Sequence, residues 1–349
     1  MMRRVAATLL VAFILLAVLA PWLSANSPER IFEDRAFAPP VRVHVKDPDG
    51  WHMPFVYRQS LIDRSGRVYV EDRDHRAPLQ WLSEGRLVSL DASDGPLLLC
   101  GADALGRDLC ARLAYGARLS LGVAVIGACG ALLLGALLGA VAGAAGGRLD
   151  TVLMTVADFV LVLPVVYLVI VLRATRPLFI DTSEVFVLMA ALFACAAWPD
   201  VARGVRSIVA TERTRDYAAA ARASGAGPLR LIGHLLPAAY GFLRIEFVLL
   251  IPALLVAESS LSFVGFGFEG AIPSWGGLLK EGETIAAMYS APWLLLPAAA
   301  LFLVVLALQT LAGSTQFLMP QPLTQRAHAV SLRADHEYSG RVPSGPDAV

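Results

Sequence analysis

The sequence contains few of the side-chain arrangements that catalytic sites need. Residues 101–108 read GADALGRD, a glycine-rich stretch that lacks the lysine and the strand-to-helix setting of a phosphate-binding loop. The six histidines are scattered, and no HExxH pair is present that could hold zinc. No Gly-x-Ser-x-Gly sequence offers a nucleophilic serine. We therefore expect no catalytic residue, no metal site and no cofactor bound by this chain, so any energy source must come from a partner.

Three acidic residues lie in or near long apolar stretches: Asp158, Glu246 and Glu258. A charge at the centre of a bilayer is costly, so such a residue usually faces a water-filled cavity or a partner. Asp158 and Glu258 are therefore candidates for lining a translocation path. The alternative is an ion pair near a membrane interface, such as Arg244 with Glu246. We favour the ion pair for Glu246, whereas the two alternatives are balanced for Asp158.

Charged residues are also dense just before the second apolar stretch. Arg107, Asp108, Arg112 and Arg118 lie within twelve positions of one another. We predict that they form an ion-pair network that fixes an external gate region. Ordinary snorkelling of long side chains to the membrane interface is an equally supported alternative.

Four cysteines are present, and their spacing gives neither a disulfide framework nor a metal motif. Cys129 and Cys195 lie inside apolar blocks, which suits small core residues. Cys100 and Cys110 could meet outside the membrane, but we favour unpaired thiols.

The composition is that of a membrane protein. The chain has 349 residues, of which 56% are hydrophobic and 17% charged, and its mean hydropathy is +0.62. A soluble domain carries about a quarter charged residues. The net charge of zero gives no sign of nucleic-acid binding. Because about 20 apolar residues cross a bilayer as a helix, we expect an all-α polytopic fold with six transmembrane helices. The apolar blocks are 5–23, 119–145, 152–172, 184–202, 240–264 and 293–313.

The polar stretch between the first two blocks predicts a separate domain. Short alternating runs at 41–45 and 67–70 indicate strands, so we expect a small β-containing external domain between helices 1 and 2. The predicted division is a first transmembrane helix, retained rather than cleaved as a signal peptide, an external domain, a five-helix transmembrane domain and a flexible cytoplasmic tail. Their boundaries are 1–25, 26–100, 101–316 and 317–349.

The distribution of arginine predicts the orientation. The loop 203–238 holds six arginines and few acids, whereas the short loop 174–183 holds only Arg176. Short loops rich in Lys and Arg stay in the cytoplasm. We therefore expect both termini and the 203–238 loop to be cytoplasmic, and residues 26–100 to be outside.

A stripe of glycines follows one face of the second span: Gly135, Gly139, Gly143 and Gly147. Small residues at this spacing let helix backbones approach closely in a membrane. We favour packing within the chain over a dimerisation face.

The 203–238 loop predicts a helix-turn-helix at the membrane surface. Asp216 can cap an alanine-rich helix, and Gly225 and Gly227 can end it. Pro228 suits the first turn of a second short helix, and Pro237 turns the chain toward the fifth span. The small face of residues 218–221 could dock in a groove of another protein. Physical reasoning alone favours a plain connector between spans.

This loop resembles the "EAA" loop of binding-protein-dependent ABC importer permeases. The matching residues are Ala220, Ala221, Gly225, Leu236 and Pro237. Ala219 stands where the family usually has glutamate, and the stretch from Gly225 to Leu236 is one residue shorter. In that family the loop is the coupling helix that sits in a cleft of the ATPase subunit. The resemblance therefore implies ATPase coupling for the loop, including Asp216.

Two further stretches resemble the C-type permease subunit of dipeptide, oligopeptide and nickel importers. The first is similar to the family's GTDxxGRDxxxRxxxGxRxSL run, and the second to its ExxLSFLGLG…PxWG segment. The first comprises Gly101, Asp103, Gly106, Arg107, Asp108, Arg112, Gly116, Arg118, Ser120 and Leu121. The second comprises Glu258, Leu261, Ser262, Gly265, Gly267, Pro273, Trp275 and Gly276. Asp158 and Pro164 also fit the family. The stretch Gln309–Ser314 and the long 26–100 insert depart from the pattern.

The resemblance implies the ABC type I importer permease fold in a bacterial inner membrane. It also implies a second permease subunit, two ATPase subunits that bind ATP-Mg, an extracytoplasmic substrate-binding protein, and contact with membrane lipid. Transport of peptides, nickel or a related small solute would follow alternating access, with no enzymatic step on this chain.

Two other classes of function stay open. A secondary transporter or channel would show inverted repeats or a row of intramembrane ionisable residues, and it would transport alone under an ion gradient. A membrane-anchored sensor acting through residues 26–100 would leave transport intact when residues 216–237 are disrupted.

Overall fold

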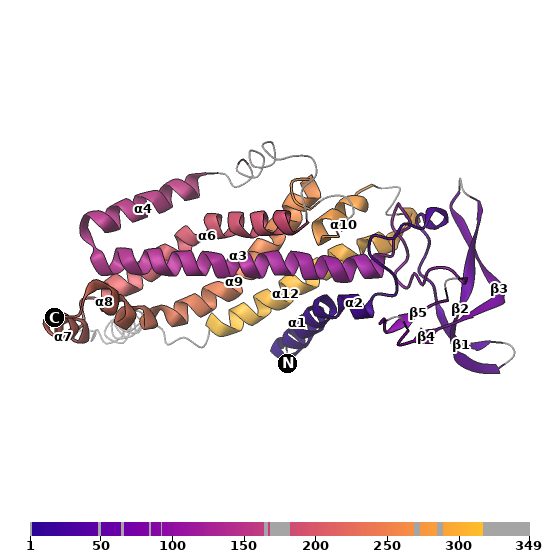
Figure 1. Ribbon diagram of the computed structural model, residues 1–349, viewed down its shortest axis with the longest axis horizontal. Coiled ribbons are helices and arrows are strands. Elements are labelled where there is room, and N and C mark those ends of the chain that lie inside the picture. Colours follow the sequence, from indigo (N-terminus) through magenta and orange to yellow (C-terminus); the bar gives the residue numbers. More distant parts are fainter. Residues whose placement is uncertain are drawn as a thin grey trace, which may run out of the picture. The chain divides into compact units, whose positions relative to one another are not determined.

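The structure is a computed structural model that describes most of the chain (Figure 1). The described residues are 2–47, 50–63, 66–83, 85–91, 93–163, 167, 182–268, 273–284 and 289–316. The chain divides into two units, Met1–Ala312 and Gly313–Val349, and the account below concerns the first. The predicted tail and Pro164 lie outside the described residues. The domain boundaries at 25, 100 and 316 stay predictions.

Helices dominate the described residues. Their order is α1 (Met2–Val18), α2 (Ala20–Leu23), α3 (Leu109–Ala145), α4 (Gly147–Val162), α6 (Thr182–Glu212), α7 (Asp216–Ala223), α8 (Pro228–Leu235), α9 (Tyr240–Val264), α10 (Trp275–Glu281) and α12 (Leu296–Gln316). Short 3₁₀ turns lie at Glu33–Arg35, Leu236–Ala239 and Pro292–Leu295. The strands are β1 (Val43–Asp47), β2 (Gly50–Asp63), β3 (Val68–Pro78), β4 (Gln80–Trp81) and β5 (Val88–Ser89).

Within the described residues, four helical segments are long and apolar enough to cross a membrane. They are Leu109–Ala145, Thr182–Glu212, Pro228–Val264 and Pro292–Gly313. The chain is thus a helical membrane protein with several spans. The counterparts of the predicted first and third spans are α1, with 17 residues, and α4, with 16. A total of six spans stays a proposal.

One predicted boundary is wrong. The block 184–202 was expected to end near Pro199, yet α6 runs through this proline to Glu212. The first ten residues of the predicted 203–238 loop are therefore the last turns of a long helix, and the connection begins at Arg213. Helix propensity and packing on α3 outweigh the lost backbone hydrogen bond of one proline.

The glycine stripe explains how α3 and α6 pack. A Cβ added at Gly135 would lie 2.5 Å from Val201, and one at Gly143 would lie 2.7 Å from the carbonyl oxygen of Arg206. Gly139 likewise meets the backbone of Ala202. Packing within the chain is thereby confirmed for these three glycines. It is wrong for Gly147, which is the first residue of α4, has φ +58° and would place an added Cβ more than 4 Å from any other atom considered.

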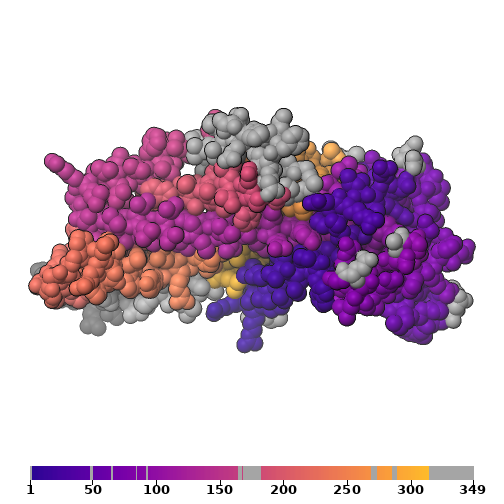
Figure 2. Space-filling model, in the orientation of Figure 1, coloured from indigo at the N-terminus to yellow at the C-terminus, as the bar shows by residue number. Residues whose placement is uncertain are grey.

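The strands form two antiparallel sheets, one in the order β1-β2-β3 and one pairing β4 with β5. The predicted runs at 41–45 and 67–70 correspond to β1 and the start of β3, whereas the long strand β2 between them was not predicted. A small core joins the larger sheet to the chain around it, through Val56, Ala77, Leu97 and Ala25. The strand region and the α7–α8 segment lie at opposite ends of α3 (Figures 1 and 2).

Candidate functional site

A buried ion-pair cluster lies at the start of α3. The Arg107 side chain contacts Asp103 at 2.6 Å and Glu281 at 2.8 Å. Arg112 contacts the same two carboxylates, Asp103 at 3.3 Å and Glu281 at 2.7 Å. The Asp103 side chain is fully buried and the Arg112 side chain is 2% exposed. The cluster therefore joins the α3 start to the end of α10, which follows it in the sequence by more than 160 residues.

Two glycines and Asp103 shape the turn that presents these arginines. One Asp103 carboxylate oxygen accepts hydrogen bonds from the backbone N–H groups of Leu105 and Arg107. Gly106 has φ +77°, and a Cβ there would overlap the Phe32 carbonyl group. Gly101 has φ +80° and lies against the Trp293 ring and the Ala38 carbonyl oxygen. Only glycine fits both the backbone angle and the space, which accounts for the Gly-x-Asp-x-x-Gly spacing.

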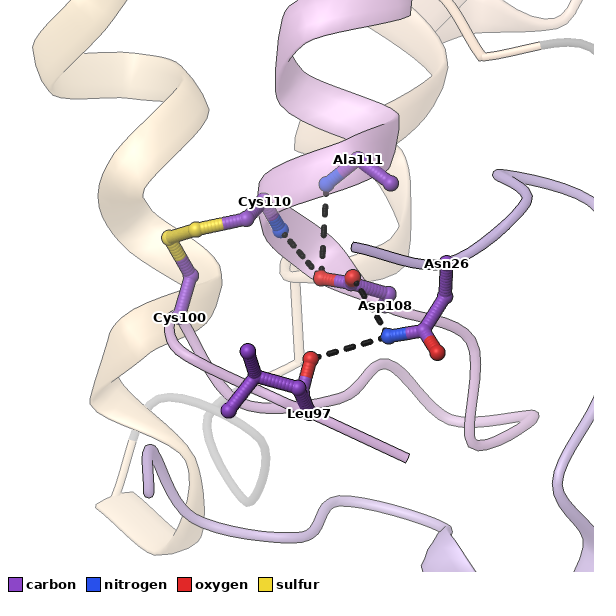
Figure 3. Close-up of a disulfide and its surroundings, with 6 residues drawn as sticks. All are labelled: Asn26, Leu97, Cys100, Asp108, Cys110 and Ala111. Atoms are coloured by element: carbon purple, nitrogen blue, oxygen red, sulfur yellow. Dashed lines mark hydrogen bonds between the residues drawn. A yellow bond between two sulfur atoms is a disulfide. The ribbon is translucent and has the colours of Figure 1, made fainter. Parts of the chain in front are cut away.

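Asp108 is not part of the ion-pair cluster, contrary to prediction. It caps α3, where one carboxylate oxygen accepts hydrogen bonds from the Cys110 and Ala111 backbone N–H groups (Figure 3). The Asn26 amide donates to its other oxygen at 2.9 Å and to the Leu97 carbonyl oxygen at 2.8 Å. Burial raises the pKa of Asp108 to about 6, against the opposing effect of these donors.

The prediction that Cys100 and Cys110 are unpaired thiols is wrong. Cys100 and Cys110 form a disulfide, with 5.1 Å between their Cα atoms (Figure 3). The turn at Gly101 reverses the chain, and the Leu109 N–H donates to the Gly101 carbonyl oxygen. Residue 100 is thereby brought to the first turn of α3, which ten residues of sequence separation alone did not indicate.

Arg118 also lies outside the cluster. Its side chain is exposed and makes no ion pair with any described residue. Of the four charged residues expected in the network, the structure brings together Arg107 and Arg112 only. The cluster's two acids are Asp103, which the family resemblance marked, and Glu281, which sequence reasoning missed.

Glu258 belongs to a buried hydrogen-bond network rather than to an open path. Its side chain has no exposed surface, and Ser262 donates to its carboxylate at 2.7 Å. The Ser262 hydroxyl in turn accepts from the Phe268 N–H. A Cβ at Gly276 would overlap the Ser259 carbonyl, so this glycine lets α10 pack closely on α9. The second family stretch thus holds α9 and α10 together.

Trp275 extends this network to α3. Its indole N–H donates to the Leu113 carbonyl oxygen at 3.1 Å, and its backbone N–H donates to the Ser120 hydroxyl at 3.2 Å. Residues of both family stretches therefore meet in one buried region, where they fix α3, α9 and α10 against each other.

The charges nearer the other end of α3 behave differently. Asp158 on α4 is exposed and pairs with Arg203 on α6, so the interhelical ion pair is confirmed for Asp158. Asp150 and Arg206 join the same two helices at 2.5 Å. The expected pair of Arg244 with Glu246 does not form among the described residues, because side chains two positions apart on a helix point to different sides of it.

The α7–α8 segment has the predicted helix-turn-helix form. Gly225 ends α7 with φ +80°, and Pro228 is the first residue of α8. Leu236 and Pro237 begin the 3₁₀ turn that leads into α9. Asp216 is the first helical residue and the cap position belongs to Arg215, so the predicted cap is wrong. Asp216 still favours the helix start through the helix dipole.

One side of the α7–α8 segment packs on the rest of the chain, and the opposite side is exposed. Ala218 is fully buried beside Leu231 and Leu235, so it faces the chain's own core rather than outward. Ala219 and Ala220 are exposed, and Ala221 is half-buried. Tyr217 is 45% exposed and Leu229 is 85% exposed. Of residues 218–221, which we expected to form a docking face, Ala218 therefore faces inward, whereas Ala219 and Ala220 are exposed, as is Asp216.

Comparison with known proteins identifies the family. Residues 116–317 match the binding-protein-dependent transport system inner membrane component. The chain belongs to this family. The match covers the four apolar segments almost completely, together with the α7–α8 segment.

The relatives found are peptide transport permeases. The chain is 31% identical to the oligopeptide transport system permease protein OppC of Bacillus subtilis, over 55% of this chain and 61% of the relative. It is 34% identical to the dipeptide transport system permease protein DppC of the same organism, over 52% and 55%. It is also 34% identical to OppC of Escherichia coli, over 56% and 63%. The chain thus spans less than two thirds of the length of these relatives.

Proposed function

We propose that this chain is a permease subunit of an ATP-driven importer. The observation that carries the proposal is the α7–α8 segment, which lies inside the family match and presents small side chains outward. Ala219 and Ala220 are exposed, and among the described residues the inner face of the segment packs on α6 and on the start of α9. An exposed small-residue face on a fixed two-helix unit suits docking in a groove of an ATPase subunit.

The proposed mechanism is alternating access with separate partner subunits. Two ATPase subunits bind and hydrolyse ATP-Mg, and this chain binds no cofactor. Closure of the ATPase pair moves the α7–α8 segment. Because Leu231, Leu235 and Ala218 pack on Val205 and Val209 of α6, the motion passes directly to a membrane helix. A second permease subunit completes the path between the two chains.

The proposed cargo is a peptide or a related small solute, with nickel as an alternative. The named functions of the relatives support peptides, but the chain matches only part of their length. Specificity rests largely with a soluble substrate-binding protein that delivers the cargo from outside.

The proposed location is a bacterial inner membrane with six spans and both termini in the cytoplasm. Arg213, Arg215 and Arg222 gather at the α7 end of the molecule, as expected for a cytoplasmic side. The Cys100–Cys110 disulfide lies at the other end of α3 and suits an oxidising compartment. The strand region would then be external.

Thiol labelling tests this orientation. In a variant without Cys129 and Cys195, we expect Ser60→Cys to react with an impermeant thiol reagent in intact cells. Ser224→Cys, at the end of α7, should react only after the membrane is opened. Ser60 and Ser224 are both exposed on the chain, so a difference in labelling would reflect the side of the membrane and not burial of the side chain. Reversed labelling would overturn the orientation and the ATPase docking with it.

A further inference from the structure

A hollow of 740 Å³ lies between the first halves of α3 and α6 and beside the segment that follows α2. Pockets that bind small molecules measure about 300–1,000 Å³ and combine apolar walls with a few polar groups. This hollow fits both criteria. Its lining includes Glu29, Tyr115, Arg118, Leu119, Phe186 and Val187.

One face of α3 forms a wall of the hollow. Tyr115, Arg118, Leu119 and Gly122 all line it, and they occupy positions i, i+3, i+4 and i+7, which is the spacing of one helix face. A Cβ at Gly122 would lie 3.2 Å from the Phe186 ring, so this glycine lets the ring of α6 close against α3. The wall is thus apolar at Gly122 and charged one turn earlier, at Arg118.

The two charges of the hollow have no partner in the described residues. Arg107 and Arg112 are taken up by the buried ion-pair cluster, whereas Arg118 makes neither an ion pair nor a hydrogen bond there. Glu29 is likewise without either among the described residues. One free cation and one free anion on the lining of a single apolar hollow are complementary to a ligand that carries both charges.

We propose that this hollow binds a zwitterionic, peptide-like solute on its way through the membrane. Arg118 binds the terminal carboxylate through charge-assisted hydrogen bonds, and Glu29 accepts from the terminal ammonium group. Apolar side chains of the solute lie against Leu119, Phe186 and Val187. This inference rests on the proposed function, and it names residues and a solute class for one subsite of the path.

Two other occupants make different predictions. An anionic lipid head group would use Arg118 but has no need of Glu29. A second permease subunit seated here would cover Val187, which is 65% exposed in this chain.

Site-directed protection tests the inference on the assembled transporter in lipid nanodiscs. Val187→Cys is introduced into a chain without Cys129 and Cys195, and its alkylation rate is measured with increasing trialanine. Neither ATP nor the binding protein is added, so the result does not depend on coupling. Transport measured separately in proteoliposomes reports on the proposed function.

The expected result is that trialanine slows labelling to saturation, while N-acetyl-trialanine amide, which lacks both charges, protects poorly. Arg118→Gln and Glu29→Gln should each raise the half-protecting trialanine concentration about fivefold, the upper range for one exposed ion pair. Arg148→Gln, an exposed arginine at the start of α4, is the matched control and should leave it unchanged.

Three results would overturn the inference. Equal protection by trialanine and by N-acetyl-trialanine amide would exclude recognition of the two charged termini. The same conclusion would follow if trialanine protected the parent, Arg118→Gln and Glu29→Gln at the same concentration. Protection by anionic lipid alone would assign Arg118 to a lipid. Failure of Val187→Cys to label in the assembled transporter, with normal labelling of the isolated chain, would assign the hollow to the second permease.

Discussion

One set of residues that resemble the family lies at the start of α3, and another lies near its other end, in the α7–α8 segment. The two sets differ in how far their side chains are in contact with the rest of the chain. At the start of α3, Asp103, Arg107, Arg112 and Glu281 form ion pairs with one another in a buried cluster. At the other end, the α7–α8 segment buries Ala218 but leaves Ala219 and Ala220 facing outward. The charges of the first set find their opposite charges within this chain, whereas the outer face of the second is exposed among the described residues. The same family resemblance therefore marks internal architecture in one region and, in the other, an exposed face for which we propose a contact with an ATPase subunit.

The largest difference between the regions should appear when the buried cluster is broken. Asp103→Asn removes the carboxylate that both arginines share and leaves two buried cations on Glu281 alone. Loss of one partner of a buried ion pair typically costs about 3–5 kcal/mol. We expect a loss of this size in the free energy of unfolding, measured by denaturation of the purified chain in detergent.

Asp74→Asn on β3 is the matched control for this change. The same substitution at an exposed carboxylate should alter stability by less than about 0.5 kcal/mol. Equal effects at the two positions would mean that the cluster contributes no more than a surface charge.

The Asp108 cap predicts a pH dependence at the start of α3. Its pKa is raised from 3.8 to about 6, so the folded chain holds the Asp108 proton more tightly than the unfolded chain does. The resulting gain in the free energy of unfolding is complete below about pH 4 and is lost as the pH rises through 6. The difference corresponds to about 3 kcal/mol. Unfolding measured between pH 4.5 and 7.5 should show this slope in the parent chain and a flatter profile in Asp108→Asn. Parallel profiles would assign the pH dependence to other groups.

The same substitution, glycine to alanine, should change stability in opposite directions in the α3–α6 contact and in α8. Gly139→Ala places a Cβ against the Ala202 backbone in the α3–α6 contact, and overpacking of this kind costs about 1–3 kcal/mol. Gly233→Ala in α8 meets no atom within 4 Å and should stabilise the helix by up to about 1 kcal/mol. Thermal unfolding of both variants checks the signs. Destabilisation of similar size at both glycines would mean that α8 is also packed against its surroundings.

The sequence predicted those parts of the molecule that depend on local pattern. Apolar blocks located α9, α12 and the end of α3 closely, although α3 begins ten residues before its block, at Leu109. The Gly225–Pro228 spacing predicted the turn between α7 and α8. Partners that meet across a long separation were missed. Glu281 reaches Arg112 across 169 positions and Asn26 reaches Asp108 across 82, and neither has a neighbouring motif that marks it. Only the fold brings such residues together.

Orientation of side chains on short helices was also beyond the sequence. All four residues of the 218–221 run are alanine, so composition gave no sign of which one faces inward. The contact of Ala218 with Leu231 and Leu235 of α8 decides it. Family motifs located the segment, but packing within the chain selected its outward face.

The central claim is that this outward face holds an ATPase subunit by shape, because no carboxylate stands at Ala219. Co-purification with a tagged ATPase tests it most directly. Ala220→Trp should leave the chain inserted in the membrane but release the ATPase, since overpacking a fitted contact weakens it. Gly225→Val should do the same through its backbone, which holds φ +80° with open space around it. Ala104→Trp, an equal change at an exposed position near the other end of α3, should retain the ATPase. Full ATPase recovery with both Ala220→Trp and Gly225→Val would contradict the account and reduce the α7–α8 segment to a connector between helices.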